Sequence, residues 1–199
     1  LAPQWLGFER RMVEHLLART DDFVGAFKKL PGNLQLMTVH ALQSVVFNKS
    51  LHARIEEGLP ISRPVAGDLV GRIDEKGQLE ASSCVVVEER TLPRIARNCQ
   101  LGRLVTTGPL PGSEINTCEG ASGTIEAKVI EQMNLHEADW NVSAIPRLST
   151  RGTRRALVTE FNELAIDTVP IANDETMGER WKTGPGSDSR RQHEGACCR

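Results

Sequence analysis

Residues 33–48, NLQLMTVHALQSVVFN, form the stretch that decides the fold of this chain. Apolar residues recur there at steps of three and four, which places one set on a single helical face: Leu34, Met37, Ala41 and Val45. A second set widens that face until most of the circumference is apolar: Val39, Leu42 and Val46. A helix of this kind belongs inside a domain. We therefore predict a helix over residues 33–57 that is buried inside the domain.

A polar stripe runs along the same helix, because His40, Ser44 and Asn48 follow one another at steps of four and Gln43 lies beside them. Buried polar groups need hydrogen-bond partners. The stripe therefore faces either an internal hydrogen-bond network or a functional site, and the sequence leaves both interpretations open. The network is the commoner outcome for such residues.

Composition excludes several classes of protein. The chain of 199 residues suits one large or two small domains, and its net charge of −2 does not indicate nucleic-acid binding. It has no run of 18 apolar residues and no secretion signal, so we predict no membrane span. The five cysteines lack zinc-site spacing. We expect a monomeric cytoplasmic protein that holds no metal, with a local basic tract at Arg147, Arg151, Arg154 and Arg155.

Patterns along the rest of the chain predict an α+β, or mixed α/β, fold. Helical periodicity covers residues 8–18, 22–29, 91–100 and 120–135. Strand patterns cover residues 68–73, 81–88 and 103–107, and a further strand is expected to end the segment 145–156 and to continue to residue 161. Residues 108–112, GPLPG, predict a rigid turn. The last residues are rich in Gly, Ser, Arg and Lys, which predicts a disordered tail over residues 174–199.

Several short motifs occur in a fixed order along the chain. They are Leu30-Pro31 with Asn33-Leu34, Val39-His40-Ala41, Gln43-Ser44, Phe47-Asn48, Gly58-Leu59-Pro60, Gly67-Asp68, Val105-Thr106 with Gly108-Pro109-Leu110 and Gly112, the set Gly123, Ile125, Glu126 and Val129, and Leu148-Ser149 with Gly152-Thr153-Arg154-Arg155 and Leu157. Their order and spacing over residues 8–158 resemble the TruD family of tRNA pseudouridine synthases, especially its archaeal branch.

The resemblance implies a domain organisation. Residues 1–60 correspond to a helical part of the family's catalytic domain, and residues 61–150 to its characteristic inserted domain. Residues 151–173 return toward the catalytic domain, and residues 174–199 form the predicted tail.

The resemblance also implies an activity. Family members convert a uridine in tRNA to pseudouridine, which requires the base to leave its stack. An Asp carboxylate attacks the nucleoside as a nucleophile, and no metal or organic cofactor is needed. That Asp lies in a Gly-Thr-Lys-Asp segment, which this sequence lacks. We therefore assign no catalytic residue here, and expect a partial chain that is inactive alone.

Two groups of site candidates follow from the resemblance. His40, Gln43, Ser44 and Asn48 are candidates for support behind a catalytic pocket, and Arg151, Arg154 and Arg155 for tRNA phosphate contacts. Neighbouring residues of a strand point to opposite faces, so we expect one of Arg154 and Arg155 to face RNA and the other to pair with a carboxylate.

Two alternative functions for the chain stay open: a non-catalytic tRNA-binding module, and a truncated product without activity.

Overall fold

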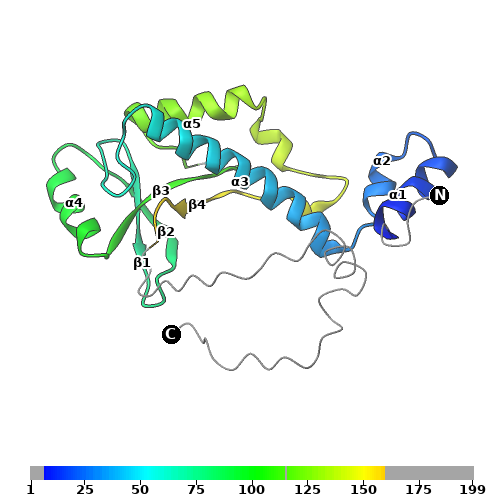
Figure 1. Ribbon diagram of the computed structural model, residues 1–199, viewed down its shortest axis with the longest axis horizontal. Coiled ribbons are helices and arrows are strands. Elements are labelled where there is room, and N and C mark those ends of the chain that lie inside the picture. The colour runs from blue at the N-terminus through cyan, green and yellow to red at the C-terminus, as the bar shows by residue number, and fades with distance from the viewer. Residues whose placement is uncertain (1–6, 115, 160–199) are drawn as a thin grey trace, which may run out of the picture.

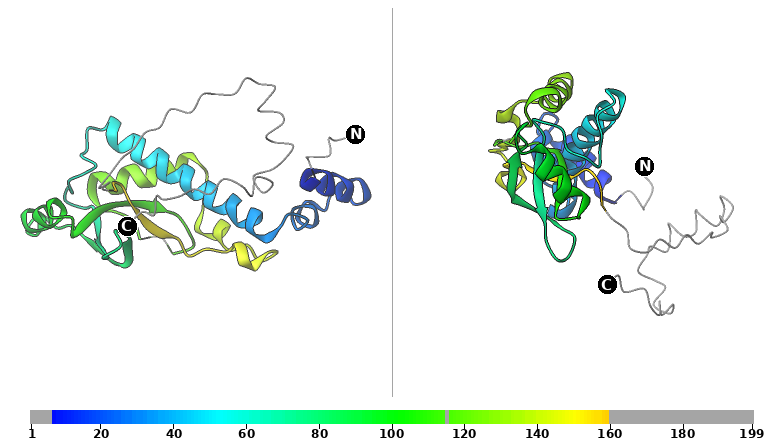
Figure 2. Two further views of the ribbon diagram at one scale, coloured as in Figure 1. Left: turned by 60° about the horizontal axis from the view of Figure 1, so that its bottom comes forward. Right: turned by 90° about the vertical axis from the view of Figure 1, so that its left-hand side faces the viewer.

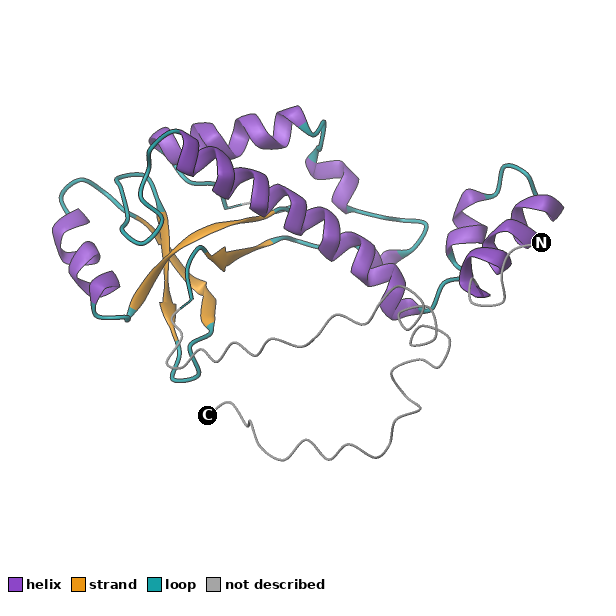
Figure 3. Ribbon diagram, viewed as in Figure 1, coloured by secondary structure: helices purple, strands orange, loops and turns teal. Residues whose placement is uncertain are grey.

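The computed structural model describes residues 7–114 and 116–159 (Figure 1). Helices and a sheet are both present, which confirms the predicted α+β class (Figure 3). The helices are α1 (Gly7–Ala18), α2 (Phe23–Phe27), α3 (Gly32–Glu56), α4 (Leu92–Gln100) and α5 (Gly120–Gln132), with short 3-10 helices η1 (Glu137–Trp140) and η2 (Pro146–Leu148). The strands are β1 (Leu69–Ile73), β2 (Leu79–Val86), β3 (Leu104–Leu110) and β4 (Thr153–Ala156).

The four strands form one antiparallel sheet in the order β2-β1-β3-β4. The β1–β2 hairpin closes through a turn in which the Asp74 amide donates to the Gln78 carbonyl, and Gly77 takes the positive φ of 75° that glycine tolerates best. The sheet is curled, so that β2 and β4 also come into contact.

The helices lie in three regions of the molecule, with α3 and α5 along its middle and the others at its two ends (Figure 1). α3 and α5 lie side by side, and α3 packs on β3 (Figures 1 and 2). α4 covers another part of the sheet, where Ile95 joins Val70 and Val87 in a small core. α1 and α2 pack on each other at the end of the molecule opposite α4 (Figure 1). No helix within the described ranges is both long and apolar enough to cross a membrane.

Asp22 begins α2, as the sequence predicts. Its carboxylate accepts a hydrogen bond of 2.7 Å from the Gly25 amide, which caps the helix. His15 Nε2 lies 2.8 Å from the same carboxylate and ties α1 to α2. The hydrogen bonds from His15 and Gly25 hold the pKa of the Asp22 carboxyl below its usual value.

The predicted turn at residues 108–112 is wrong for its first half, because β3 continues to Leu110. β1 pairs with residues 104–106 and β4 with residues 107–110. Pro109 therefore lies beyond the part of β3 that pairs with β1, where its missing N–H costs no ladder hydrogen bond on that side. β4 ends at Ala156 instead of continuing through residues 157–159, and residues 160–161 and the predicted tail lie outside the described ranges.

The predicted burial of α3 is correct for one side of the helix and wrong for the other. On the Leu34 face, Met37 is 60% exposed and Val45 is 42% exposed. The opposite side is buried instead, through Gln35, Gln43, Val46, Phe47, Ser50 and Arg54. A helix that is apolar over most of its circumference gives no periodic signal for one side, so the neighbouring sheet and α5 decide the orientation. The predicted domain boundaries at residues 60 and 150 remain predictions.

Candidate functional site

The polar stripe of α3 separates into two parts. Gln43 is buried and its Nε2 donates to the Pro111 carbonyl at 2.8 Å, which ties α3 to the segment that follows β3. His40 and Asn48 are exposed and Ser44 is half-buried. Their side chains make no hydrogen bond within residues 7–114 and 116–159. Gln43 thus belongs to an internal network, whereas the other three border the solvent.

Arg154 is buried, and every N–H group of its guanidinium faces an acceptor. Its Nη2 and Nη1 donate to the two carboxylate oxygens of Glu126 at 2.7 and 2.9 Å. Further bonds reach the Thr107 carbonyl at 2.8 Å, the Thr107 hydroxyl at 3.1 Å and the Asn116 carbonyl at 3.0 Å. Arg154 is therefore the strand arginine that pairs with a carboxylate, and it has no donor left for a phosphate.

The surroundings of Arg154 are buried, and their electrostatics reflect this. Burial works to lower the pKa of Arg154, but hydrogen bonding and attraction to Glu126 more than offset it, so that its pKa is raised. Burial, reinforced by Glu126, raises the pKa of the nearby Cys118 thiol to about 12. The guanidinium thus stays charged and the thiol stays neutral. The hydrogen bonds of Arg154 hold β4, β3 and α5 together, and neither Arg154 nor Cys118 offers a reactive group.

Arg155 points to the opposite side of β4 and is exposed. The central carbon of its guanidinium lies 5.0 Å from the centre of the Phe47 ring, a cation–π arrangement. Gly108 pairs with Arg155 across the strands, and a Cβ there would lie 2.8 Å from Phe47 Cε2. The absence of a side chain at Gly108 therefore lets the Phe47 ring lie close against the sheet.

The structure brings some members of the α3 polar stripe close to one of the candidate arginines. Phe47 lies three residues after Ser44 and seven after His40, so these side chains share one side of α3, with Asn48 one turn beyond Ser44. Arg155 rests on Phe47. Arg151 is 83% exposed, and its Nε lies 3.7 Å from a carboxylate oxygen of the exposed Glu114. An exposed pair of this kind contributes little and leaves the guanidinium accessible.

A second buried ion pair was not predicted from the sequence. Arg54, near the end of α3, donates from Nη1 and Nη2 to the two carboxylate oxygens of Asp68 at 2.7 Å each. The Ser122 hydroxyl donates to Asp68 at 2.6 Å, and Arg54 Nε donates to the Pro60 carbonyl at 2.8 Å. Asp68 belongs to the Gly67-Asp68 motif, but no local spacing connects it with Arg54.

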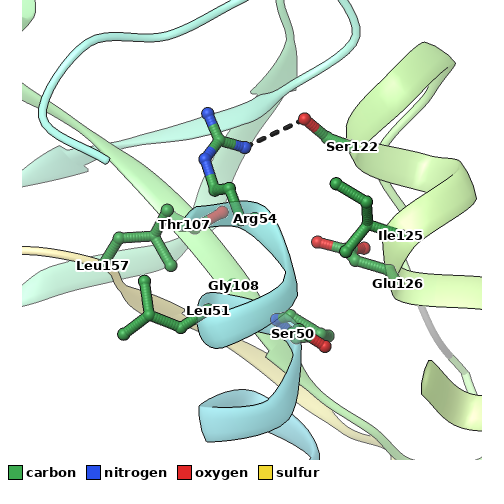
Figure 4. Close-up of a pocket in the computed structure, with 10 residues that line it drawn as sticks. Ser50, Leu51, Arg54, Thr107, Gly108, Ser122, Ile125, Glu126 and Leu157 are labelled. Atoms are coloured by element: carbon green, nitrogen blue, oxygen red, sulfur yellow. Dashed lines mark hydrogen bonds between the residues drawn. The ribbon is translucent and has the colours of Figure 1, made fainter. Parts of the chain in front are cut away.

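A small cavity lies where α3, β3 and α5 meet (Figure 4). Its walls include Ser50, Arg54, Gly108, Ser122 and Leu157, and it holds about 20 Å³, which is room for one water molecule. The Ser50 hydroxyl in this wall has no hydrogen-bond partner among residues 7–114 and 116–159. A ligand pocket ordinarily measures hundreds of cubic ångströms, so this cavity does not accommodate a nucleotide base.

Comparison with known proteins shows which family the chain resembles. The family model described as tRNA pseudouridine synthase D (TruD) matches residues 1–177. "Probable tRNA pseudouridine synthase D" of Methanosarcina mazei is 38% identical over 158 residues, which cover 79% of this chain and 36% of that protein. The protein of the same description from Halobacterium salinarum is 34% identical over 175 residues, 85% of this chain and 39% of that protein.

The fold agrees with these matches. The crystal structure described as "Putative tRNA pseudouridine synthase D (TruD)" from Methanosarcina mazei matches this structure with a TM-score of 0.74 at 38% identity, over 78% of this chain and 36% of that chain. This chain therefore spans a little over a third of the length of these relatives. Because the family model covers most of the sequence and the structures agree at this identity, the chain belongs to the TruD family of tRNA pseudouridine synthases.

Proposed function

We propose that this chain forms the part of a cytoplasmic tRNA pseudouridine synthase that holds the RNA beside the reacting uridine. The match of the TruD family model to residues 1–177 carries this proposal. In the proposed reaction the uridine leaves its stack, and a carboxylate attacks the nucleoside. The base is then detached, turned and rejoined through carbon. The Gly-Thr-Lys-Asp segment is absent from these 199 residues, so in this proposal the chain supplies RNA contacts and not the nucleophile.

Arg155 is the proposed central RNA contact. Its guanidinium is exposed and is oriented by the Phe47 ring, so less side-chain freedom is lost when it binds a phosphate. A guanidinium matches two phosphate oxygens with parallel N–H groups. His40, Ser44 and Asn48 lie along the same edge of α3 and would contact the RNA there, with Arg151 as a further phosphate contact.

The same proposal explains the exposed apolar face of α3. Met37, Val45 and Ile55 are 60%, 42% and 54% exposed. The relatives are almost three times as long as the part that matches this chain. We infer that this face packs against a portion of the family fold that residues 7–159 do not contain, and that this portion carries the nucleophile.

A chimera tests the proposal. The part of this chain that matches the Methanosarcina mazei protein over 158 residues would replace its counterpart there, and that protein itself would serve as the positive control. Mass spectrometry of a tRNA treated with the chimera should detect pseudouridine, whereas the 199-residue chain alone should form none. A folded chimera that forms no pseudouridine, or a chain that is active alone, would contradict the proposal.

Arg155 is tested in the same chimera. Arg155→Ala should weaken tRNA binding and make it less dependent on salt, because a phosphate contact is lost. Arg155→Lys keeps the charge and should recover part of the affinity. Arg63→Ala, which removes an exposed arginine from the loop after α3, is the matched control. Equal effects of Arg155→Ala and Arg63→Ala would count against a specific contact.

A further inference from the structure

Residues 90–103 form a second basic segment, separate in sequence from the tract that contains Arg151 and Arg155. The chain has a net charge of −2, yet this segment contains four arginines and no Asp or Glu: Arg90, Arg94, Arg97 and Arg103. All four are exposed. Arg90 is paired with Glu88, which lies just outside the segment. The other three make no ion pair with a carboxylate within the described part of the chain. A surface that mixes both signs is the ordinary arrangement for a folded domain, and this segment departs from it.

The geometry of α4 directs two of these arginines away from the protein. Ile95 packs on the sheet, with Leu92 and Cys99 on the same side of the helix. Arg94 and Arg97 are three residues apart, so they are neighbours on the opposite side. Leu101 follows there and is 56% exposed. The outer surface of α4 is therefore a basic strip whose position is fixed by an apolar inner side.

The stability of α4 does not account for this strip. Arg97 lies in the last turn, where a cation interacts favourably with the helix dipole. Arg94 lies in the first turn, at the positive end of the same dipole, where a cation is unfavourable. No carboxylate in the helix offsets it. Arg94 therefore slightly destabilises the helix and has no carboxylate partner within the described part of the chain. An arginine placed in this way is suited to binding another molecule.

We propose that the outer surface of α4, through Arg94 and Arg97 with Arg103 beside its end, is a second phosphate-binding surface for the same tRNA. This inference rests on the proposed function and extends the RNA-contacting surface from β4 to the end of the molecule opposite α1 (Figures 1 and 2). The ligand is the phosphate backbone, because exposed guanidinium groups without a shaped base pocket read no sequence. RNA helices are recognised largely through this backbone and its shape.

The test is tRNA binding by the 199-residue chain over a range of salt concentrations. Arg94→Ala combined with Arg97→Ala should weaken binding by about tenfold, because two charge-assisted contacts are lost. The slope of log affinity against log salt should become shallower by about 2. Arg94→Lys combined with Arg97→Lys should retain most of the slope. Circular dichroism should be unchanged, since both side chains are exposed.

Lys28→Ala combined with Lys29→Ala is the matched control, because it removes the same charge at the end of the molecule near α1 and α2. It should leave the affinity within about twofold and the slope unchanged. Three results would overturn the inference: no tRNA binding by the parent chain, no effect of the α4 substitutions, or an equal effect of the lysine substitutions. The last two results leave the proposed function intact, because that function is tested by pseudouridine formation in the chimera, whereas absence of tRNA binding would also count against the RNA-holding role proposed for the chain.

Discussion

On its inner side α3 buries mostly polar residues, whereas its outer side exposes apolar ones. Four of its six buried residues are Gln35, Gln43, Ser50 and Arg54. A helix at a protein surface ordinarily buries its apolar stripe and exposes its polar face. The reversal shows that the inner side is held to the rest of the fold by directed hydrogen bonds, and that the outer side has the composition of a surface that packs against protein.

The hydrogen bonds of the inner side are long-range and nearly complete. Arg54 bonds Asp68, Gln43 bonds the Pro111 carbonyl, and Gln35 Oε1 accepts a hydrogen bond from Arg147 Nη2 at 2.5 Å. Directed contacts of this kind are costly to leave half-made. Nonpolar contacts on the outer side tolerate many partners of similar shape. Substitutions on the two sides should therefore differ in both size and kind.

The largest effect is expected at Arg54. Arg54→Met leaves the fully buried Asp68 carboxylate without its cation, which should reduce the free energy of unfolding by about 3–5 kcal/mol. Urea denaturation followed by circular dichroism measures it. Lys49→Met, at an exposed position of the same helix, is the control and should change stability by less than about 0.5 kcal/mol. Similar losses in both variants would remove the contrast between the two sides.

A smaller effect is expected at Gln43. Gln43→Met keeps the volume of the side chain but leaves the buried Pro111 carbonyl without its donor, at a cost of about 1–3 kcal/mol. The same urea titration measures the change, with Gln100→Met on the exposed side of α4 as the control. A stability equal to that of the parent chain would mean that water replaces the amide, so that the inner side is less specific than its contacts suggest.

Part of this contrast was predictable from the sequence and part was not. Apolar periodicity located α3 and α5, and the β-branched runs around Gly77 located the hairpin, because these signals are local. Strand alternation predicted that Arg154 and Arg155 would differ, but not which is buried. That choice depends on β4 pairing with β3 so that Arg154 meets Glu126 and Arg155 meets Phe47. The Arg54–Asp68 pair likewise depends on a loop geometry that spacing does not encode.

The smallest effect on stability, and the most informative about function, is expected on the outer side. Met37→Lys combined with Val45→Lys should leave the unfolding free energy of the isolated chain within about 0.5 kcal/mol, because both residues are exposed there. Self-association, measured by analytical ultracentrifugation, should fall because an exposed apolar patch is removed. In the chimera the same pair would place two charges in a protein interface, which should abolish pseudouridine formation.

The control for the outer side is Gln78→Lys combined with Gln132→Lys, which adds two charges at exposed polar positions outside α3. It should be tolerated in both the isolated chain and the chimera. Full activity of the chimera with lysine at positions 37 and 45 would mean that solvent, and not protein, covers this face in the longer protein. Loss of activity in the chimera beside unchanged stability in the chain would separate the two roles of α3, because only an interface absent from the isolated chain produces that combination.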